Sequence, residues 1–156
     1  MGMMEIRRNV LAFDSVMDGN IFDPQKVQPV NANYSATCGN NYIKIEKTTS
    51  TSSPYGRTKT ATANLRLTPG KKYKLTTTIK DFSQSNLTGL VYISDSKSNI
   101  VAQTEQLTTV HIGDKLQMEF VYASTMTELS FYMNRSFNVS LGTYIIYGDI
   151  LILEIA

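Results

Sequence analysis

An alternation of apolar and polar side chains, interrupted by one turn, runs through Leu65-Arg66-Leu67-Thr68-Pro69-Gly70-Lys71-Lys72-Tyr73-Lys74-Leu75-Thr76-Thr77-Thr78-Ile79-Lys80. Successive side chains of an extended chain point to opposite faces, so Tyr73, Leu75, Thr77 and Ile79 share one face. Lysines and threonines occupy the other. A period of two residues is typical of a strand with one buried and one solvated side. The segment therefore predicts a strand, a Pro-Gly turn and a second strand.

The same alternation recurs along most of the chain, with hardly any helical period. About eight or nine short strands around one core are typical of an all-β protein, a two-sheet antiparallel sandwich. We expect a short N-terminal arm beside it. The predicted strands are 42–47, 57–67, 72–80, 87–94, 100–104, 106–112, 115–123, 127–134 and 143–155.

Residues 1–30 differ from the rest of the chain. Ile6, Val10 and Phe13 recur at near-helical spacing, and turn residues fill the segment that follows. We predict a docking arm over residues 1–30 and a sandwich domain over residues 31–156. Residues 150–153 are apolar on both faces of their strand, so the arm or a partner subunit is expected to cover one of them.

Composition excludes several classes of partner. The length of 156 residues suits one domain, and a net charge of +2 with scattered lysines makes no basic stripe for nucleic acid. Cys38 is the only cysteine, which excludes an internal disulfide. No window reaches the roughly 20 apolar residues of a membrane span. Early charges interrupt the pattern of a signal peptide.

Three segments carry a family pattern: Leu67-Thr68-Pro69-Gly70-Lys71-Lys72-Tyr73-Lys74-Leu75, the pair Leu116-Gln117-Met118-Glu119-Phe120 and Leu129-Ser130-Phe131-Tyr132-Met133, and Tyr147-Gly148-Asp149-Ile150-Leu151-Ile152. They resemble segments of the jelly-roll carbohydrate-binding modules, which are galactose-binding-like sandwiches. The resemblance covers roughly residues 40–156. It implies that the all-β fold is a two-sheet antiparallel jelly-roll sandwich and that the protein is a non-catalytic module that recognises cell-surface glycans.

Thr/Asn-rich sandwiches with an N-terminal arm also resemble parts of bacteriophage tails and baseplates. Arms of such parts commonly anchor and trimerise, so this resemblance implies a homo-oligomer, a trimer being favoured. It also implies other virion or tail proteins as partners, and a virion or extracellular location. The alternative is a purely structural assembly subunit that binds protein neighbours and no sugar.

The sequence offers little for catalysis. His111 has no acidic neighbour within its predicted strand. Glycoside hydrolysis needs two carboxylates across a cleft, and Glu46, Glu119 and Glu128 fall on the solvated faces of predicted strands. No serine lies in a nucleophile elbow. We predict that the protein is not an enzyme.

A sugar site needs aromatic rings for the apolar face of a pyranose and polar groups for its hydroxyls. Tyr92 and Tyr132 are expected to face outward and supply the rings. Asn134, Arg135 and Gln117 would supply hydrogen bonds nearby if neighbouring strands pair. A second candidate set lies at the rim of the sandwich and consists of Tyr55 and Arg57.

The resemblance also implies a structural calcium ion. Asp149 matches the closing-strand position of these modules. Calcium prefers several oxygen ligands, and no Asp-x-Asp run accompanies Asp149. A solvated or capping acid is the alternative for Asp149, and no other cofactor is predicted.

Overall fold

The computed structural model describes residues 26–39 and 41–155, which form ten strands and one short 3₁₀ helix. The elements are β1 (Gln28–Pro29), β2 (Tyr34–Gly39), β3 (Tyr42–Lys47), β4 (Tyr55–Ala61), η1 (Thr62–Asn64), β5 (Lys72–Phe82), β6 (Val91–Asp95), β7 (Ile100–Gln103), β8 (Lys115–Val121), β9 (Met126–Arg135) and β10 (Tyr144–Ile155).

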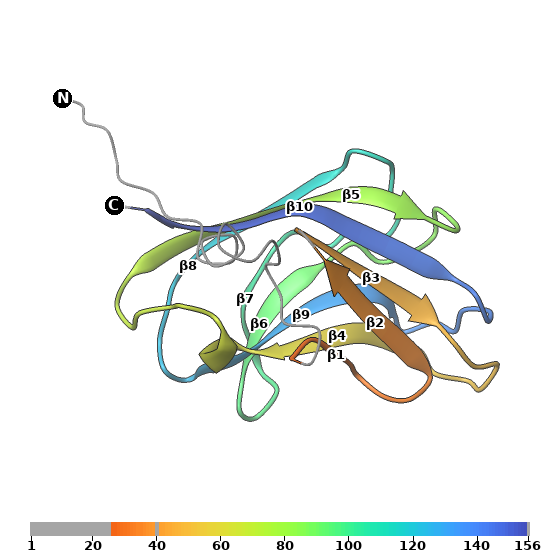
Figure 1. The fold of residues 1–156 in the computed structure, drawn as a ribbon, viewed down its shortest axis with the longest axis horizontal. Coiled ribbons are helices and arrows are strands. Elements are labelled where there is room, and N and C mark those ends of the chain that lie inside the picture. Colours follow the sequence, from red (N-terminus) through yellow and green to blue (C-terminus); the bar gives the residue numbers. More distant parts are fainter. Residues whose placement is uncertain (1–25, 40, 156) are drawn as a thin grey trace.

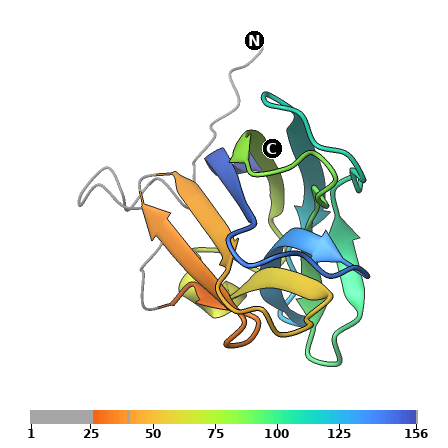
Figure 2. The same ribbon diagram turned by 90° about the vertical axis from the view of Figure 1, so that its right-hand side faces the viewer.

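The strands form two five-stranded antiparallel sheets, which face each other as a jelly-roll sandwich. The β9 sheet has the order β1-β4-β9-β6-β7, and the β10 sheet has the order β2-β3-β10-β5-β8. In Figure 1 the β10 and β5 strands lie in the upper layer and the β4 and β9 strands in the lower one. Figure 2 shows the β2–β3 hairpin (orange) far from β8 (teal), at the opposite edge of their sheet. The predicted fold class is confirmed.

The two-residue period builds the core. In β5, Tyr73, Leu75, Thr77 and Ile79 are at most 1% exposed, as the sequence predicts. Full burial of a large apolar side chain contributes roughly 1.5–3 kcal/mol, so this one face stabilises the sheet substantially. Across the sandwich the ring of Tyr147 meets the buried ring of Phe131 edge to face, and this contact helps to hold the two layers in register.

The strand after the Pro-Gly turn forms as predicted, but residues 65–67, predicted to end the strand before it, lie outside any strand. Strand β4 ends at Ala61, η1 follows, and the chain then passes from the β9 sheet to the β10 sheet before β5 begins at Lys72. Strand β5 pairs with β10 and β8 instead. Gly70 has a φ of +89°, a conformation that glycine adopts without steric cost. The turn therefore lies in a connection between the two sheets. The alternation of side chains along the sequence cannot distinguish such a connection from a hairpin within one sheet.

Residues 106–112, predicted as a strand, form a loop with a single bridge between Leu107 and Gly89. His111 lies in this loop, and its Nδ1 atom is 3.6 Å from Oδ2 of Asp114, an acidic residue just beyond the predicted strand. Cys38 lies in β2.

Part of the predicted arm belongs to the sandwich. Val27 is buried in the core, and Gln28 and Pro29 pair with β4. The remaining prediction for the arm, with its helical spacing and docking role, concerns residues 1–25 and lies outside the described residues. Within the described residues, no helix has the length and apolar character needed to cross a membrane.

Candidate functional site

The candidate site lies on the outer face of the β9 sheet, the face turned away from the β10 sheet. In β9, Leu129 and Phe131 point into the core. Side chains alternate along a strand, so Glu128, Ser130 and Tyr132 fall on the outer face. Strand β6 contributes Tyr92 to the same face, opposite Ser130.

Tyr92 and Tyr132 lie together on this face. Their ring centroids are 5.4 Å apart with an interplanar angle of 66°, and their hydroxyl oxygens are 3.4 Å apart. With Leu90 they form a small cluster separate from the main core. The rings face outward as predicted, but only 7% of Tyr92 and 5% of Tyr132 is exposed. Little ring area is left for a sugar, so the pair forms the base of the site.

Burial raises the pKa of Tyr132 well above the ordinary tyrosine value, and the hydrogen bond with Tyr92 acts in the same direction. The nearby guanidinium groups of Arg57 and Arg135 oppose this shift more weakly. The phenol therefore stays protonated at neutral pH. A neutral hydroxyl both donates and accepts hydrogen bonds.

Arg57 lies over β9 and forms a fixed polar group on the outer face. Its Nη1 donates to Glu128 Oε1 at 2.8 Å and to Ser130 Oγ at 2.9 Å. The sequence prediction gives Glu128 only as a candidate catalytic acid. Its position an even number of residues before Tyr132 on the same strand is the signal that the two side chains share this face. Glu46 and Glu119 lie on the β10 sheet, so neither shares the β9 sheet with Glu128.

A β-bulge decides where the end of β9 points. Tyr132 pairs with Arg57 and Asn134 pairs with Gly56, so Met133 has no residue opposite it on β4. An extra residue reverses the alternation from that point on. Asn134 consequently points inward and is fully buried, with its Nδ2 3.1 Å from the Tyr34 hydroxyl. The expectation that Asn134 offers a polar group to solvent is wrong.

The same bulge brings Arg135 to the outer face. Its guanidinium carbon lies 5.7 Å from the ring centroid of Tyr132, and its Nη1 donates to Gln106 Oε1 at 2.7 Å. Tyr55 is directly opposite Arg135 on β4 and is 50% exposed. Side chains of directly opposed residues share a face. The two predicted sets therefore merge into one site, in which Tyr55 supplies the open ring and Gln106 is an unpredicted member.

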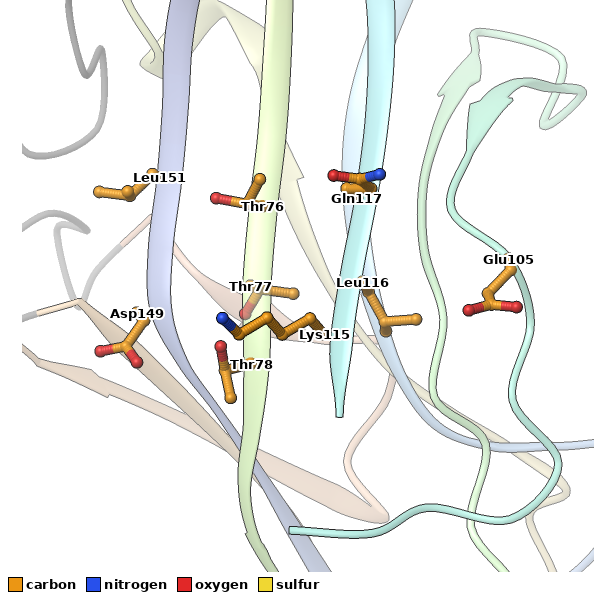
Figure 3. Close-up of a pocket in the computed structure, with 9 residues that line it drawn as sticks. All are labelled: Thr76, Thr77, Thr78, Glu105, Lys115, Leu116, Gln117, Asp149 and Leu151. Atoms are coloured by element: carbon orange, nitrogen blue, oxygen red, sulfur yellow. The ribbon is translucent and has the colours of Figure 1, made fainter. Parts of the chain in front are cut away.

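Gln117 lies on β8, in the other sheet, so the expectation that it accompanies Tyr132 is wrong. It lines a hollow of about 710 Å³ over β10, β5 and β8, together with Thr76, Thr78 and Lys115 (Figure 3). The Lys115 side chain reaches from β8 across β5 toward β10. This polar hollow is a second candidate surface, and no aromatic side chain of residues 26–39 and 41–155 lines it.

Asp149, the predicted calcium ligand, borders this hollow within a bulge of β10. Its Oδ2 is 2.6 Å from Nζ of Lys80, and the described part of the chain places only one further carboxylate, Glu105, on the hollow. Among the described residues no group of three or more His, Cys, Asp or Glu side chains gathers as a metal site would require. These donors do not fit a calcium site, because calcium prefers six or more oxygen ligands.

Solved structures show which class of protein has this fold. A family 4 carbohydrate-binding module matches 84% of this chain and 96% of its own, with a TM-score of 0.58 and 12% identity. The CBM22-1 xylan-binding domain of Paenibacillus barcinonensis Xyn10C matches 96% of this chain and 93% of its own, with a TM-score of 0.50 and 10% identity. This chain therefore has the fold of the jelly-roll carbohydrate-binding modules.

A longer chain also contains this fold. The CBM22-1–GH10 modules of Clostridium thermocellum xylanase 10B, complexed with xylohexaose, match 86% of this chain with a TM-score of 0.54 and 11% identity. This chain spans 27% of that one. No protein-family model matches the chain, and no curated protein matches it.

Proposed function

We propose that this chain is a non-catalytic carbohydrate-binding module that holds a polysaccharide on the outer face of the β9 sheet. The observation that carries the proposal is the position of the open ring of Tyr55 beside Arg135, on a face that already holds Tyr132. An exposed ring suits the apolar face of a pyranose, and guanidinium and amide groups suit its hydroxyls.

The polar groups of this face are held in place before a ligand arrives. Glu128 and Ser130 orient Arg57, and Gln106 orients Arg135. Polar groups that are already ordered lose less conformational entropy on binding. The shared fold of the solved carbohydrate-binding modules supports the same function, and the match to those modules supports a binding role without catalysis.

Affinity gel electrophoresis against xylan, β-glucan, mannan, galactan and polygalacturonate tests the proposal. We expect the wild-type chain to be retarded by at least one polymer, and Tyr55→Ala to weaken that retardation at least tenfold. Tyr42→Ala is the matched control, because Tyr42 is 40% exposed but lies on the β10 sheet. If no polymer retards the wild-type chain, the proposal fails.

The variant Gln117→Ala separates the two candidate surfaces. It removes the amide that lines the hollow on the β10 sheet and leaves the β9 sheet untouched. If Gln117→Ala weakens retardation and Tyr55→Ala does not, the sugar binds over the β10 sheet and the proposed site is wrong.

A place in a bacteriophage tail or baseplate, with cell-surface polysaccharide and other virion proteins as partners, is part of the same proposal. Its support is the sequence resemblance, together with the partly exposed apolar side chains of Leu151, Leu153 and Ile155 along β10. Such a row suits a contact with another chain. Sedimentation analysis of the full chain is expected to give an oligomer, a trimer being favoured, and a monomer at all concentrations would contradict the assembly role.

A further inference from the structure

We propose that the hollow at the end of β9, beyond Arg135, binds a sugar residue that carries a carboxylate, so that the ligand is an acidic polysaccharide. This inference rests on the proposed function and narrows it to a class of glycan. The hollow measures about 510 Å³, which suits one or two sugar rings. Arg135 lies between this hollow and the outer face of the β9 sheet.

Among the described residues, Arg135 is the only charged one that lines the hollow. Its neighbours are the neutral amide of Gln106 and the ring of Tyr132, and no carboxylate of the described residues lies within ion-pair distance of it. Arg57, on the same face, is already paired with Glu128. The charge of Arg135 is therefore available to a ligand.

The chemistry of this guanidinium favours a carboxylate over a hydroxyl group. Gln106 occupies Nη1, and the remaining N–H groups form a planar fork that matches two carboxylate oxygens. Hydrogen bonds between two charged groups are also stronger than those to a neutral hydroxyl. A uronic acid supplies such a group at the edge of its ring.

The rest of the lining suits a sugar ring. Phe137 is a partly buried ring that can meet the apolar face of a pyranose. Thr108 contributes a hydroxyl, and Asn86 and Asn138 contribute amides. Asn138 accepts hydrogen bonds from Ser52 and Ser53 through Oδ1. These bonds fix the orientation of the amide, so its NH₂ group can donate to a ligand.

The loop that carries Phe137 is fixed by hydrogen bonds at three places. The Ser136 N–H donates to the Pro54 carbonyl at 2.9 Å, and Asn134 Nδ2 donates to the Phe137 carbonyl at 2.7 Å. The Ser53 N–H donates to Asn138 Oδ1 at 2.9 Å. A hollow whose walls are ordered in advance binds at a smaller entropic cost.

The test compares polymers that differ only in their carboxylates. Polygalacturonate, alginate and hyaluronate are each paired with a carboxyl-reduced derivative of the same backbone, and dissociation constants are measured by isothermal titration calorimetry on the full chain. We expect at least one carboxylated polymer to bind at least tenfold more tightly than its reduced form. Added salt should narrow this difference, because part of it is electrostatic.

Variants assign the preference to Arg135. Arg135→Gln should bind the carboxylated and reduced polymers within about twofold of each other, and Arg135→Lys should keep part of the preference. Lys97→Gln, in the exposed β6–β7 hairpin, removes the same charge elsewhere and should behave as the wild-type chain does. If Lys97→Gln loses the preference as fully as Arg135→Gln, a general charge effect replaces the proposed pocket.

The outcomes separate this inference from the proposed function. If the wild-type chain binds neutral or reduced polymers as tightly as carboxylated ones, the proposed preference of the hollow for a carboxylated sugar is wrong. The carbohydrate-binding function then stands. If the chain binds no polymer of either kind, both fail.

Discussion

The ammonium group of Lys47 lies 2.7 Å from the carbonyl oxygen of Thr51, inside the protein, where only 1% of the lysine is exposed. It also donates to the carbonyl of Val139 at 3.3 Å and lies 5.9 Å from the ring centroid of Tyr34. One buried cation thus joins the loop after β3 to the loop after β9. The loop after β9 also carries Phe137 and Asn138, which line the hollow proposed for an acidic sugar, so the contact bears on both stability and binding.

Lys47→Met should destabilise the fold. The substitution keeps most of the apolar stem but removes the donor, and buried carbonyls left without a donor cost about 1–3 kcal/mol. Urea unfolding followed by circular dichroism measures this change. The matched control is Lys44→Met on the same strand, where the lysine side chain is 36% exposed and paired with Glu46. The control should cost less than about 1 kcal/mol, and equal losses in the two variants would contradict the interpretation.

Asn134→Leu should loosen the loop that follows β9. The amide of Asn134 donates to the Tyr34 hydroxyl and to the carbonyl of Phe137, and the Tyr34 hydroxyl donates onward to the carbonyl of Ser53. A leucine leaves the Phe137 carbonyl without this donor and the Tyr34 hydroxyl with one bond fewer, at a cost of about 1–3 kcal/mol. Hydrogen exchange should show reduced protection of the amide of Ser136. Unchanged protection there would show that the other contacts hold the loop without Asn134.

Alternation along single strands could be predicted from the sequence, because each side chain's environment depends on its immediate neighbours. Alternate residues of β5, from Tyr73 to Ile79, point inward as expected, and Tyr92 and Tyr132 point outward together. The failure at Asn134 has one cause, the extra residue Met133, which has no partner on β4. A bulge is a property of two paired strands, and neither strand alone contains it.

Sheet membership also could not be predicted. Gln117 was grouped with Tyr132 because their strands, β8 and β9, follow each other along the chain. The two strands lie in different sheets, since the Ser124-Thr125 connection crosses between the layers. The sequence did not predict Gln106 as a site residue, because the alternation over residues 106–112 is typical of a strand and these residues form a loop instead.

Alkaline pH should unfold the protein through its buried tyrosines. Burial raises the pKa of Tyr147 above its ordinary value of 10.0. Above about pH 10 the unfolded chain loses this proton and the folded chain keeps it, so the unfolded state binds fewer protons. The free energy of unfolding therefore falls with rising pH, by about 1.4 kcal/mol per pH unit for each such tyrosine, and is unaffected by this group below pH 10.

Tyr147→Phe tests this origin. The Tyr147 hydroxyl donates to the carbonyl of Tyr132 at 2.7 Å and accepts from the N–H of Leu90 at 3.0 Å, so the variant should lose about 1–3 kcal/mol at pH 8. Between pH 10 and 11 its stability should fall less steeply than that of the wild-type chain. Urea unfolding at several pH values provides both numbers, and an equally steep fall would assign the alkaline sensitivity to other groups.

Glu128→Gln should weaken polysaccharide binding with little effect on stability. Glu128 and Arg57 are 2.8 Å apart, with side chains 32% and 20% exposed, so the pair contributes at most about 1 kcal/mol to folding. Its larger effect is on binding, because the carboxylate fixes the guanidinium that faces the ligand. Calorimetric titration with a polymer that binds the wild-type chain should show an affinity reduced about three- to tenfold, which corresponds to roughly 0.7–1.4 kcal/mol. Glu119→Gln removes the partner of Lys72 on the β10 sheet and should leave the affinity unchanged. A loss of affinity in Glu119→Gln but not in Glu128→Gln would place the ligand on the opposite sheet, because each glutamate reports only on its own face.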